Sequence, residues 1–303
     1  MTTIGIIDIG TNTILCLKGI IHDGKFDIVF DRRYHYRAGK RFDDVENISL
    51  EYKTNLRLAL LTAVSSINDC DKIKIVATEI FRRPKDGCMY AEQLSAELGY
   101  PIEIIDNQRE AELSFKGAIS GFGNLSGKIG VIDIGGGSTE IAVGENQKLL
   151  SWSGLKIGAV AIREAVGYDC PLDSYLTYAV DTFRHSNFVD ILNPSPDKMV
   201  IVGGTAVAVA GLTIGLREFE PERLQGWEID VLSLKHLLEK LAAMDIDNRK
   251  KLMAFEPERA DIIISGGAII LAFMRFAAID TLKVSTRGLR YGLLEEIGRQ
   301  FNA

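Results

Sequence analysis

One short segment occurs twice in this chain and constrains its fold more than any other feature. Residues 4–10 read IGIIDIG and residues 129–135 read IGVIDIG, so six of the seven positions are identical. Each copy is an apolar run that ends in Asp-Ile-Gly, then small polar residues, then a second apolar run, which is the pattern of strand, tight turn and strand. The repeat therefore predicts two similar domains that face each other, with a ligand in the cleft between them.

Strand and helix patterns alternate along the rest of the chain, which predicts an α/β fold. The segments 199–212 and 261–274 each read as a buried strand, a glycine turn and an apolar helix, and further helices are expected at residues 50–68, 91–98, 232–244 and 289–301. We expect one domain over residues 1–122, a second over residues 123–286, and a C-terminal helix (287–303) that packs back on the first.

Composition excludes several classes of protein. The chain has 303 residues, 47% of them hydrophobic, and a net charge of −6, which does not fit a surface that grips nucleic acid. The four cysteines have no zinc-site or disulfide spacing, so we expect a cytoplasmic protein. Residues 1–10 show no basic segment followed by a cleavable apolar stretch, so no secretion signal is expected. The longest apolar run near the C-terminal part, residues 262–273, is too short to span a bilayer, so no membrane role is expected.

The two repeated turns are candidate phosphate-binding loops, because small residues present several backbone N–H groups with nothing bulky in the way. The candidate residues are Gly10, Thr11 and Asn12 in the first loop, and Gly135, Gly136, Gly137 and Ser138 in the second. Asp8 and Asp133 would repel phosphate directly, so we expect them to hold a divalent cation. Glu140, on the strand after the second loop, is a further candidate for the metal or its water. The alternative is two ordinary hairpins, with Glu140 exposed on a strand.

Three other positions could contribute to chemistry. Glu110 follows a strand that ends near Ile105; it either completes a capping box with Asn107 or acts as general base for an attacking water. Arg82 either clamps phosphate at a strand end or is a solvated surface residue. Gly204 and Thr205 open a helix after a strand, a geometry that binds phosphate but also serves close packing, and the same two interpretations apply to the glycines at 266–267.

Together these motifs resemble the Ppx/GppA phosphatases, the exopolyphosphatases and guanosine pentaphosphate (pppGpp) phosphohydrolases of the actin, sugar-kinase and Hsp70 (ASKHA) superfamily. The resemblance covers essentially the whole chain and is carried by DIGTNTI, VATEIFRR, DNQREAELSFKGA, VIDIGGGSTEI, LKIGAVAI, VGGTA, PERADIIISGGAII and STRGLRYGLL. It implies two ribonuclease-H-like domains with a cleft between them and Mg²⁺-assisted hydrolysis of a terminal phosphoanhydride.

The resemblance also implies roles for single residues. Glu110 matches the catalytic glutamate of the family, and Asp133 and Glu140 match its essential acidic residues near the metal. The residues from Gly135 to Ser138 match the main phosphate loop, Asp8 with residues 10–12 matches the first loop, and Arg82 matches a phosphate-contacting arginine. We therefore expect Mg²⁺ to be held by Asp133 and Glu140 with help from Asp8, while Glu110 activates water.

The sequence departs from the usual family pattern at several positions. Leu15 stands where Arg or His is frequent, Arg109 stands where the pattern has a glutamate, and Glu79, Pro84, Asp86 and Tyr291 are further changes. These changes put long-chain polyphosphate binding and pppGpp preference in doubt. Longer members of the family also have C-terminal helical domains that this chain lacks, so a preference for short polyphosphate is expected.

Two alternative functions remain open at this point. One is an ATP-dependent kinase or ATPase of the same superfamily, with a nucleotide pocket at Gly203–Thr205 and Gly266–Gly267. The other is a catalytically weak sensor that binds polyphosphate or a guanosine alarmone. Inorganic polyphosphate or pppGpp is the expected partner, and a homodimer is the expected assembly.

Overall fold

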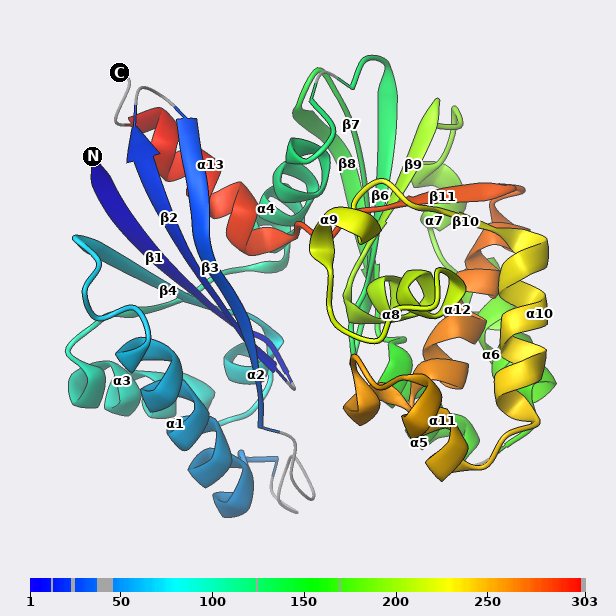
Figure 1. Ribbon diagram of the computed structural model, residues 1–303, viewed down its shortest axis with the longest axis horizontal. Helices are drawn as coiled ribbons and strands as arrows, with labels where there is room; N and C mark the ends of the chain where they lie inside the picture. Colours follow the sequence, from blue (N-terminus) through cyan, green and yellow to red (C-terminus); the bar gives the residue numbers. More distant parts are fainter. Residues whose placement is uncertain (12, 23–24, 37–45, 124, 169, 301–303) are drawn as a thin grey trace. The chain divides into compact units, whose positions relative to one another are not determined.

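The computed structural model describes residues 1–11, 13–22, 25–36, 46–123, 125–168 and 170–300 (Figure 1). By its internal contacts the chain divides into unit 1, residues 1–113 with 289–303, and unit 2, residues 114–288. The division falls inside one helix, α4 (Asn107–Ser120), whose first half belongs to unit 1 and second half to unit 2. Domain limits at 122/123 and 286/287 remain a prediction.

Unit 1 is built on a five-stranded sheet of order β3-β2-β1-β4-β5. Its strands are β1 (Thr2–Ile9), β2 (Thr13–His22), β3 (Lys25–His35), β4 (Lys72–Ala77) and β5 (Ile102–Ile104). The first three are antiparallel neighbours, and β4 and β5 continue the sheet in parallel with β1. The helices of this unit are α1 (Leu50–Ser65), α2 (Glu79–Arg82), α3 (Gly87–Leu98), the start of α4, and α13 (Leu289–Gln300).

Both faces of β1 are buried, because helices cover each of them. Ile7 and Ile9 pack with Leu56 and Leu60 of α1. Ile4 and Ile6 belong to a second cluster that contains Leu294 and other residues of α13. Side chains alternate between the faces of a strand, so Asp8 shares the face of Ile4 and Ile6, on the α13 side.

Unit 2 repeats this arrangement. Its sheet has the order β10-β11-β9-β6-β7-β8, and without β10 the order and strand directions are those of unit 1. The strands are β6 (Lys128–Ile134), β7 (Thr139–Glu145), β8 (Lys148–Leu155), β9 (Lys198–Val202), β10 (Glu228–Asp230) and β11 (Thr281–Val284). The α/β class, the duplication and two ribonuclease-H-like sheets are therefore confirmed.

The remaining helices all belong to unit 2. They are α5 (Ala159–Val166), α6 (Leu172–Arg184), α7 (Phe188–Ile191), α8 (Gly204–Thr213), α9 (Pro221–Leu224), α10 (Val231–Ala242), α11 (Ile246–Leu252) and α12 (Ile263–Phe276), with a short 3₁₀ turn at Pro257–Arg259. Asp230 caps α10 by accepting the N–H of Ser233 at 2.8 Å. Among the described residues no helix has the length and apolar content needed to cross a membrane.

One expected strand is wrong. In the segment 261–274 we expected strand, turn and helix, but α12 begins at Ile263 and contains Gly266 and Gly267 in its interior. The helix is buried on all sides, and an apolar run that is buried all round has the same pattern in either structure. Its glycines serve close packing, because a Cβ at Gly266 would lie 2.6 Å from Thr205 and one at Gly267 would collide with Leu238.

Candidate active site

The repeated segment forms the same tight turn in both units. The N–H of Gly10 donates to the carbonyl of Thr13 at 3.1 Å, and the N–H of Gly135 donates to that of Ser138 at 3.0 Å. Thr11 is half-buried in the first turn, and Asn12 lies outside the described residues. The sequence repeat is thus also a repeat of local geometry at the ends of β1 and β6.

Helix α5 orients the second loop. The N–H of Ala159 donates to the carbonyl of Gly135 at 3.0 Å, and the N–H of Val160 donates to that of Gly136 at 2.9 Å. In a trans peptide the N–H points opposite to the carbonyl, so the N–H groups of Gly136 and Gly137 face away from α5. Two adjacent donors that point the same way form a site for an anion.

Gly158, directly before α5, permits this contact. A Cβ at this position would lie 2.5 Å from the carbonyl atoms of Gly136, so any other residue would push the loop away. The close approach of two backbone segments therefore requires glycine here.

Asp133 and Glu140 lie directly opposite each other on the antiparallel strands β6 and β7. Cross-strand partners have their side chains on the same face of the sheet, so two half-buried carboxylates adjoin the glycine loop. Ser114 of α4 donates to Asp133 at 3.4 Å. Gly203, with φ of +102°, lies beside them: a Cβ there would lie 3.1 Å from Asp133 Oδ1.

This donor set fits a magnesium ion. Mg²⁺ usually binds one or two protein carboxylates and completes its shell with water and substrate phosphate. Asp133 and Glu140 supply two such carboxylates. In the part of the chain that the structure describes, no cluster of three or more His, Cys, Asp or Glu suited to a metal occurs, so a cage made only of protein ligands is not formed there.

Asp8 has different surroundings from Asp133. It is 8% exposed at the end of β1, and its cross-strand partner is Leu15 in place of a carboxylate. The nearby Arg290 is fully buried; burial opposes its charge, but Asp31, Tyr291 and Asp8 outweigh this and raise the pKa of Arg290.

Glu110 is held by Arg82. The guanidinium donates to Glu110 Oε2 at 2.8 Å and to the carbonyl of Ile105 at 2.5 Å. The capping box with Asn107 is wrong, because Asp106 caps α4 by accepting the N–H of Arg109 at 2.7 Å. Glu110 is therefore not needed to cap the helix.

The pKa of Glu110 is raised, mainly by its burial and further by Glu79, although the charge and hydrogen bond of Arg82 act in the opposite direction. A carboxylate with a raised pKa is a stronger base once it has lost its proton. Arg82 is thus the partner of Glu110 in this structure, a contact that the sequence alone did not indicate.

Side chains pack around the start of α8 at Gly204 and Thr205. Thr205 is buried against Gly266, and a Cβ at Gly204 would collide with the guanidinium of Arg259. Arg259 in turn pairs with Glu256 at 2.9 Å. Sequence analysis did not single out Arg259 or Ser114, although Ser114 lies one helical turn from Glu110 and could have been found by that spacing.

A sequence model described as the Ppx/GppA phosphatase family matches residues 20–300 of this chain. The chain belongs to the Ppx/GppA phosphatase family. Similar curated Ppx/GppA relatives include exopolyphosphatase 2 of Mycobacterium tuberculosis, 27% identical over 97% of this chain and 98% of that protein.

Relatives that are longer than this chain are named for the second activity of the family, which acts on a guanosine polyphosphate. Guanosine-5'-triphosphate,3'-diphosphate pyrophosphatase of Vibrio campbellii is 26% identical over 96% of this chain but only 58% of its own length. Among solved structures, a Ppx/GppA member from Aquifex aeolicus matches with a TM-score of 0.84 and 24% identity over 100% of this chain and 99% of that one. An exopolyphosphatase from Cytophaga hutchinsonii matches with a TM-score of 0.88 and 20% identity over 98% of each chain. At these identities the solved structures confirm the fold alone.

The departures from the usual Ppx/GppA pattern have structural partners in this chain. Asp86 is buried and accepts the N–H of Ile48 at 2.9 Å, and Lys53 pairs with its second oxygen at 2.5 Å. Tyr291 donates to Asp31 at 2.7 Å and so joins α13 to β3.

Proposed function

We propose that this chain hydrolyses terminal phosphoanhydrides, releasing phosphate from short inorganic polyphosphate, from pppGpp, or from both. Membership of a phosphatase family and the names of the relatives support this reaction class. The observation that carries the proposal is that Asp133 and Glu140 are cross-strand partners beside the glycine loop. The contacts of α5 with the carbonyls of this loop leave the loop N–H groups facing away from the helix. An anion site next to two carboxylates fits a phosphate that arrives with a magnesium ion.

Phosphate binding is assigned first to Gly135, Gly136, Gly137 and Ser138. Their backbone donors need no side chains and leave room for a tetrahedral anion. We assign a supporting role to the first loop, Gly10, Thr11 and Asn12, and to Gly204 and Thr205 at the start of α8. Arg82 is assigned to the terminal phosphate as well, which requires it to share its donors with Glu110.

Asp133 and Glu140 would hold Mg²⁺, and we include Asp8 as a third contributor. The ion would neutralise the phosphate oxygens, which is the main requirement of phosphoryl transfer. Gly203 supports this role because it lets Asp133 sit against the backbone at the end of β9.

Glu110 is proposed as the base that takes a proton from the attacking water. Burial raises its pKa, while Arg82 fixes the direction of the carboxylate. Glu110 and Ser114 occupy successive turns of one face of α4, and Ser114 contacts Asp133.

A phosphate-release panel tests the function. Tripolyphosphate, long-chain polyphosphate, pppGpp and ATP are each incubated with the protein, with Mg²⁺ and with chelator. We expect Mg²⁺-dependent release from tripolyphosphate or pppGpp, weaker release from long chains and none from ATP. Release from ATP alone would favour a kinase or ATPase, and tight binding of every polyanion without turnover would favour a sensor.

The kinase alternative has less support than the hydrolase. It needs a nucleotide pocket beside Gly266 and Gly267, and both are buried inside α12. We also propose a cytoplasmic location, which is supported by the free cysteines at 16, 70, 88 and 170. We further propose a homodimer, which light scattering of the purified chain would test.

A further inference from the structure

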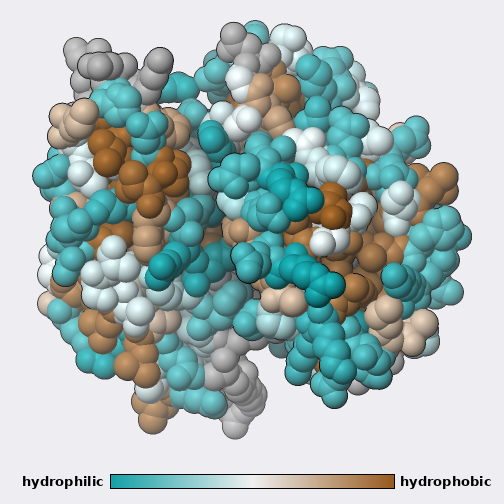
Figure 2. Space-filling model, in the orientation of Figure 1, coloured by the Kyte–Doolittle hydropathy of each residue, from teal (hydrophilic) through white to brown (hydrophobic). Residues whose placement is uncertain are grey.

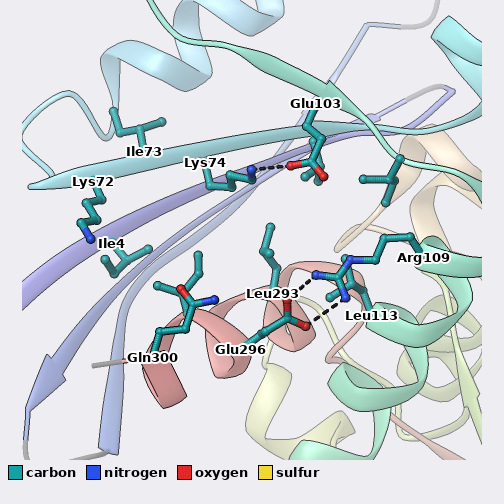
Figure 3. Close-up of a pocket in the computed structure, with 13 residues that line it drawn as sticks. Ile4, Lys72, Ile73, Lys74, Glu103, Arg109, Leu113, Leu293, Glu296 and Gln300 are labelled. Carbon is teal, nitrogen blue, oxygen red and sulfur yellow. Dashed lines mark hydrogen bonds and ion pairs between the residues drawn. The ribbon is translucent and has the colours of Figure 1, made fainter. Parts of the chain in front are cut away.

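A second ion pair, besides Arg82–Glu110, holds the start of α4. Arg109 forms two hydrogen bonds to the carboxylate of Glu296 on α13, one of them at 3.0 Å and the other shorter. Figure 3 shows both bonds. The two side chains are 31% and 29% exposed, so the pair is partly shielded from water. Glu296 also raises the pKa of Arg109 through this hydrogen bond, more than burial lowers it.

Arg109 is the residue directly before Glu110. Neighbouring residues in a helix point about 100° apart, so the two face different elements. Glu110 is tied to Arg82 after β4, and Arg109 is tied to α13. The first turn of α4 is therefore fixed by one ion pair on each of two adjacent faces.

Packing gives little support on the Arg109 side. A cavity of about 490 Å³ lies there between the sheet, α4 and α13 (Figure 3). Its floor includes Ile4, Val76 and Leu293, and its rim carries the Arg109–Glu296 pair and an opposing pair of Lys74 with Glu103. One turn further on, Leu113 is completely buried. The core therefore holds α4 at Ala111 and from Leu113 onward, whereas residues 107–110 are not buried and are held by the Asp106 cap and the two ion pairs.

We propose that Arg109 and Glu296 are positioning residues that hold the first turn of α4 so that Glu110 points correctly. The proposal rests on the proposed function, in which Glu110 is the base. Displacing a catalytic group by about 1 Å can cost up to about a hundredfold in rate. A loose first turn would therefore reduce kcat before it affected folding.

The test is a charge exchange in the full chain. Arg109→Glu and Glu296→Arg are made singly and together, and kcat, KM and Tm are measured with tripolyphosphate or pppGpp, whichever the panel identifies. Each single variant should lower kcat about tenfold with KM nearly unchanged, and the double variant should recover to within about threefold of the parent. Exposed ion pairs add little to stability, so Tm should move by only a few degrees.

The matched control is the Arg57–Glu97 pair, which joins α1 to α3 with the same two-bond geometry and includes no residue of α4 or α13. Its exchange should leave kcat unchanged. Single variants at 109 and 296 with kcat within twofold of the parent would overturn the proposal, as would a double variant no better than the singles. If a charge-reversal variant does not fold, Arg109→Met and Glu296→Gln test the same ion pair by removing one charge at a time, with the same criteria for kcat.

A failure of the positioning role can be distinguished from a failure of the proposed function. If Glu110→Gln abolishes turnover and the exchange has no effect, only the positioning role is wrong. If Glu110→Gln retains full activity, the assignment of the base is wrong, and the positioning role is overturned with it.

Discussion

Glu110 is a carboxylate whose surroundings favour the neutral form, yet its nearest partner is a cation. Its side chain is 22% exposed, and loss of hydration raises its pKa more than Arg82 lowers it. Both facts suit a base: burial gives it proton affinity, and the guanidinium fixes its direction.

Replacing Glu110 with Gln should remove turnover and preserve binding. The amide keeps the size of the side chain and an acceptor for Arg82 but cannot take a proton. We expect kcat to fall by about a thousandfold, within the range for loss of a general base. Phosphate release measures turnover, and calorimetry with tripolyphosphate measures binding. Equal loss of binding and turnover would contradict the role of a base.

The pH dependence should depend on Arg82. A base works only when deprotonated, so activity is lost as pH falls through the pKa of Glu110, and this acid limb should lie above the range of an ordinary glutamate. Arg82 lowers that pKa, whereas Glu79 raises it. Arg82→Met should therefore move the acid limb of kcat/KM to higher pH. An increase in KM with the acid limb unmoved would instead indicate that Arg82 contacts phosphate alone.

Gly203 should tolerate no side chain. Its φ of +102° disfavours other residues, and a Cβ would lie 2.5 Å from the carbonyl oxygen of Ile134. Gly203→Ala should cost about 2 kcal/mol of stability from backbone strain and displace Asp133, raising the Mg²⁺ concentration needed for activity. Gly215→Ala is the control, since Gly215 has φ of +70° and open space around it. Urea unfolding and Mg²⁺ titration of both variants check this.

At the level of elements, α13 is joined to β3 by a buried charge. Arg290 donates to both oxygens of Asp31 at 3.0 and 2.8 Å, and Tyr291 donates to one of them. Asp31→Ala leaves the guanidinium buried without its partner and should cost about 3 kcal/mol. Arg290→Met removes the charge instead and should cost less. Urea unfolding of the two variants compares them, and equal losses would contradict the asymmetry.

Most elements could be predicted from the sequence because their patterns are local. The hairpins after Asp8 and Asp133 follow from alternating apolar residues and small turn residues, and α10 follows from its cap and amphipathic spacing. The start of α12 could not, because helix and strand look alike when every side is buried. The cap of α4 was misplaced by one residue, since Asp106 and Asn107 are both good capping residues.

The parts of the candidate site that are formed by residues close together in the sequence could be predicted. Contacts between residues far apart in the sequence could not. Hairpin register alone places Glu140 opposite Asp133. The Arg82–Glu110 pair joins residues 28 positions apart, and each had a separate explanation in the sequence. The same holds for Arg109 with Glu296, which are 187 positions apart.

For the whole molecule, duplication has left two similar sheets with different chemistry at matching positions. Asp133 faces Glu140 across its hairpin, whereas Asp8 faces Leu15. Only unit 2 therefore pairs two carboxylates at this place within the described residues. Glu140→Leu, which makes the second hairpin resemble the first, should weaken Mg²⁺ activation at least about tenfold. Leu15→Glu in the same chain should not restore it, and a Mg²⁺ titration that shows full rescue would contradict this asymmetry.

The contact between α5 and the glycine loop has a thermodynamic consequence. Glycine is the residue that loses most conformational freedom when it is ordered, and three consecutive glycines would normally make anion capture entropically costly. Here the amides of Ala159 and Val160 have already fixed the carbonyls of that stretch during folding. The ordering cost thus falls on the stability of unit 2, and a phosphate that arrives later meets donors that are already aligned.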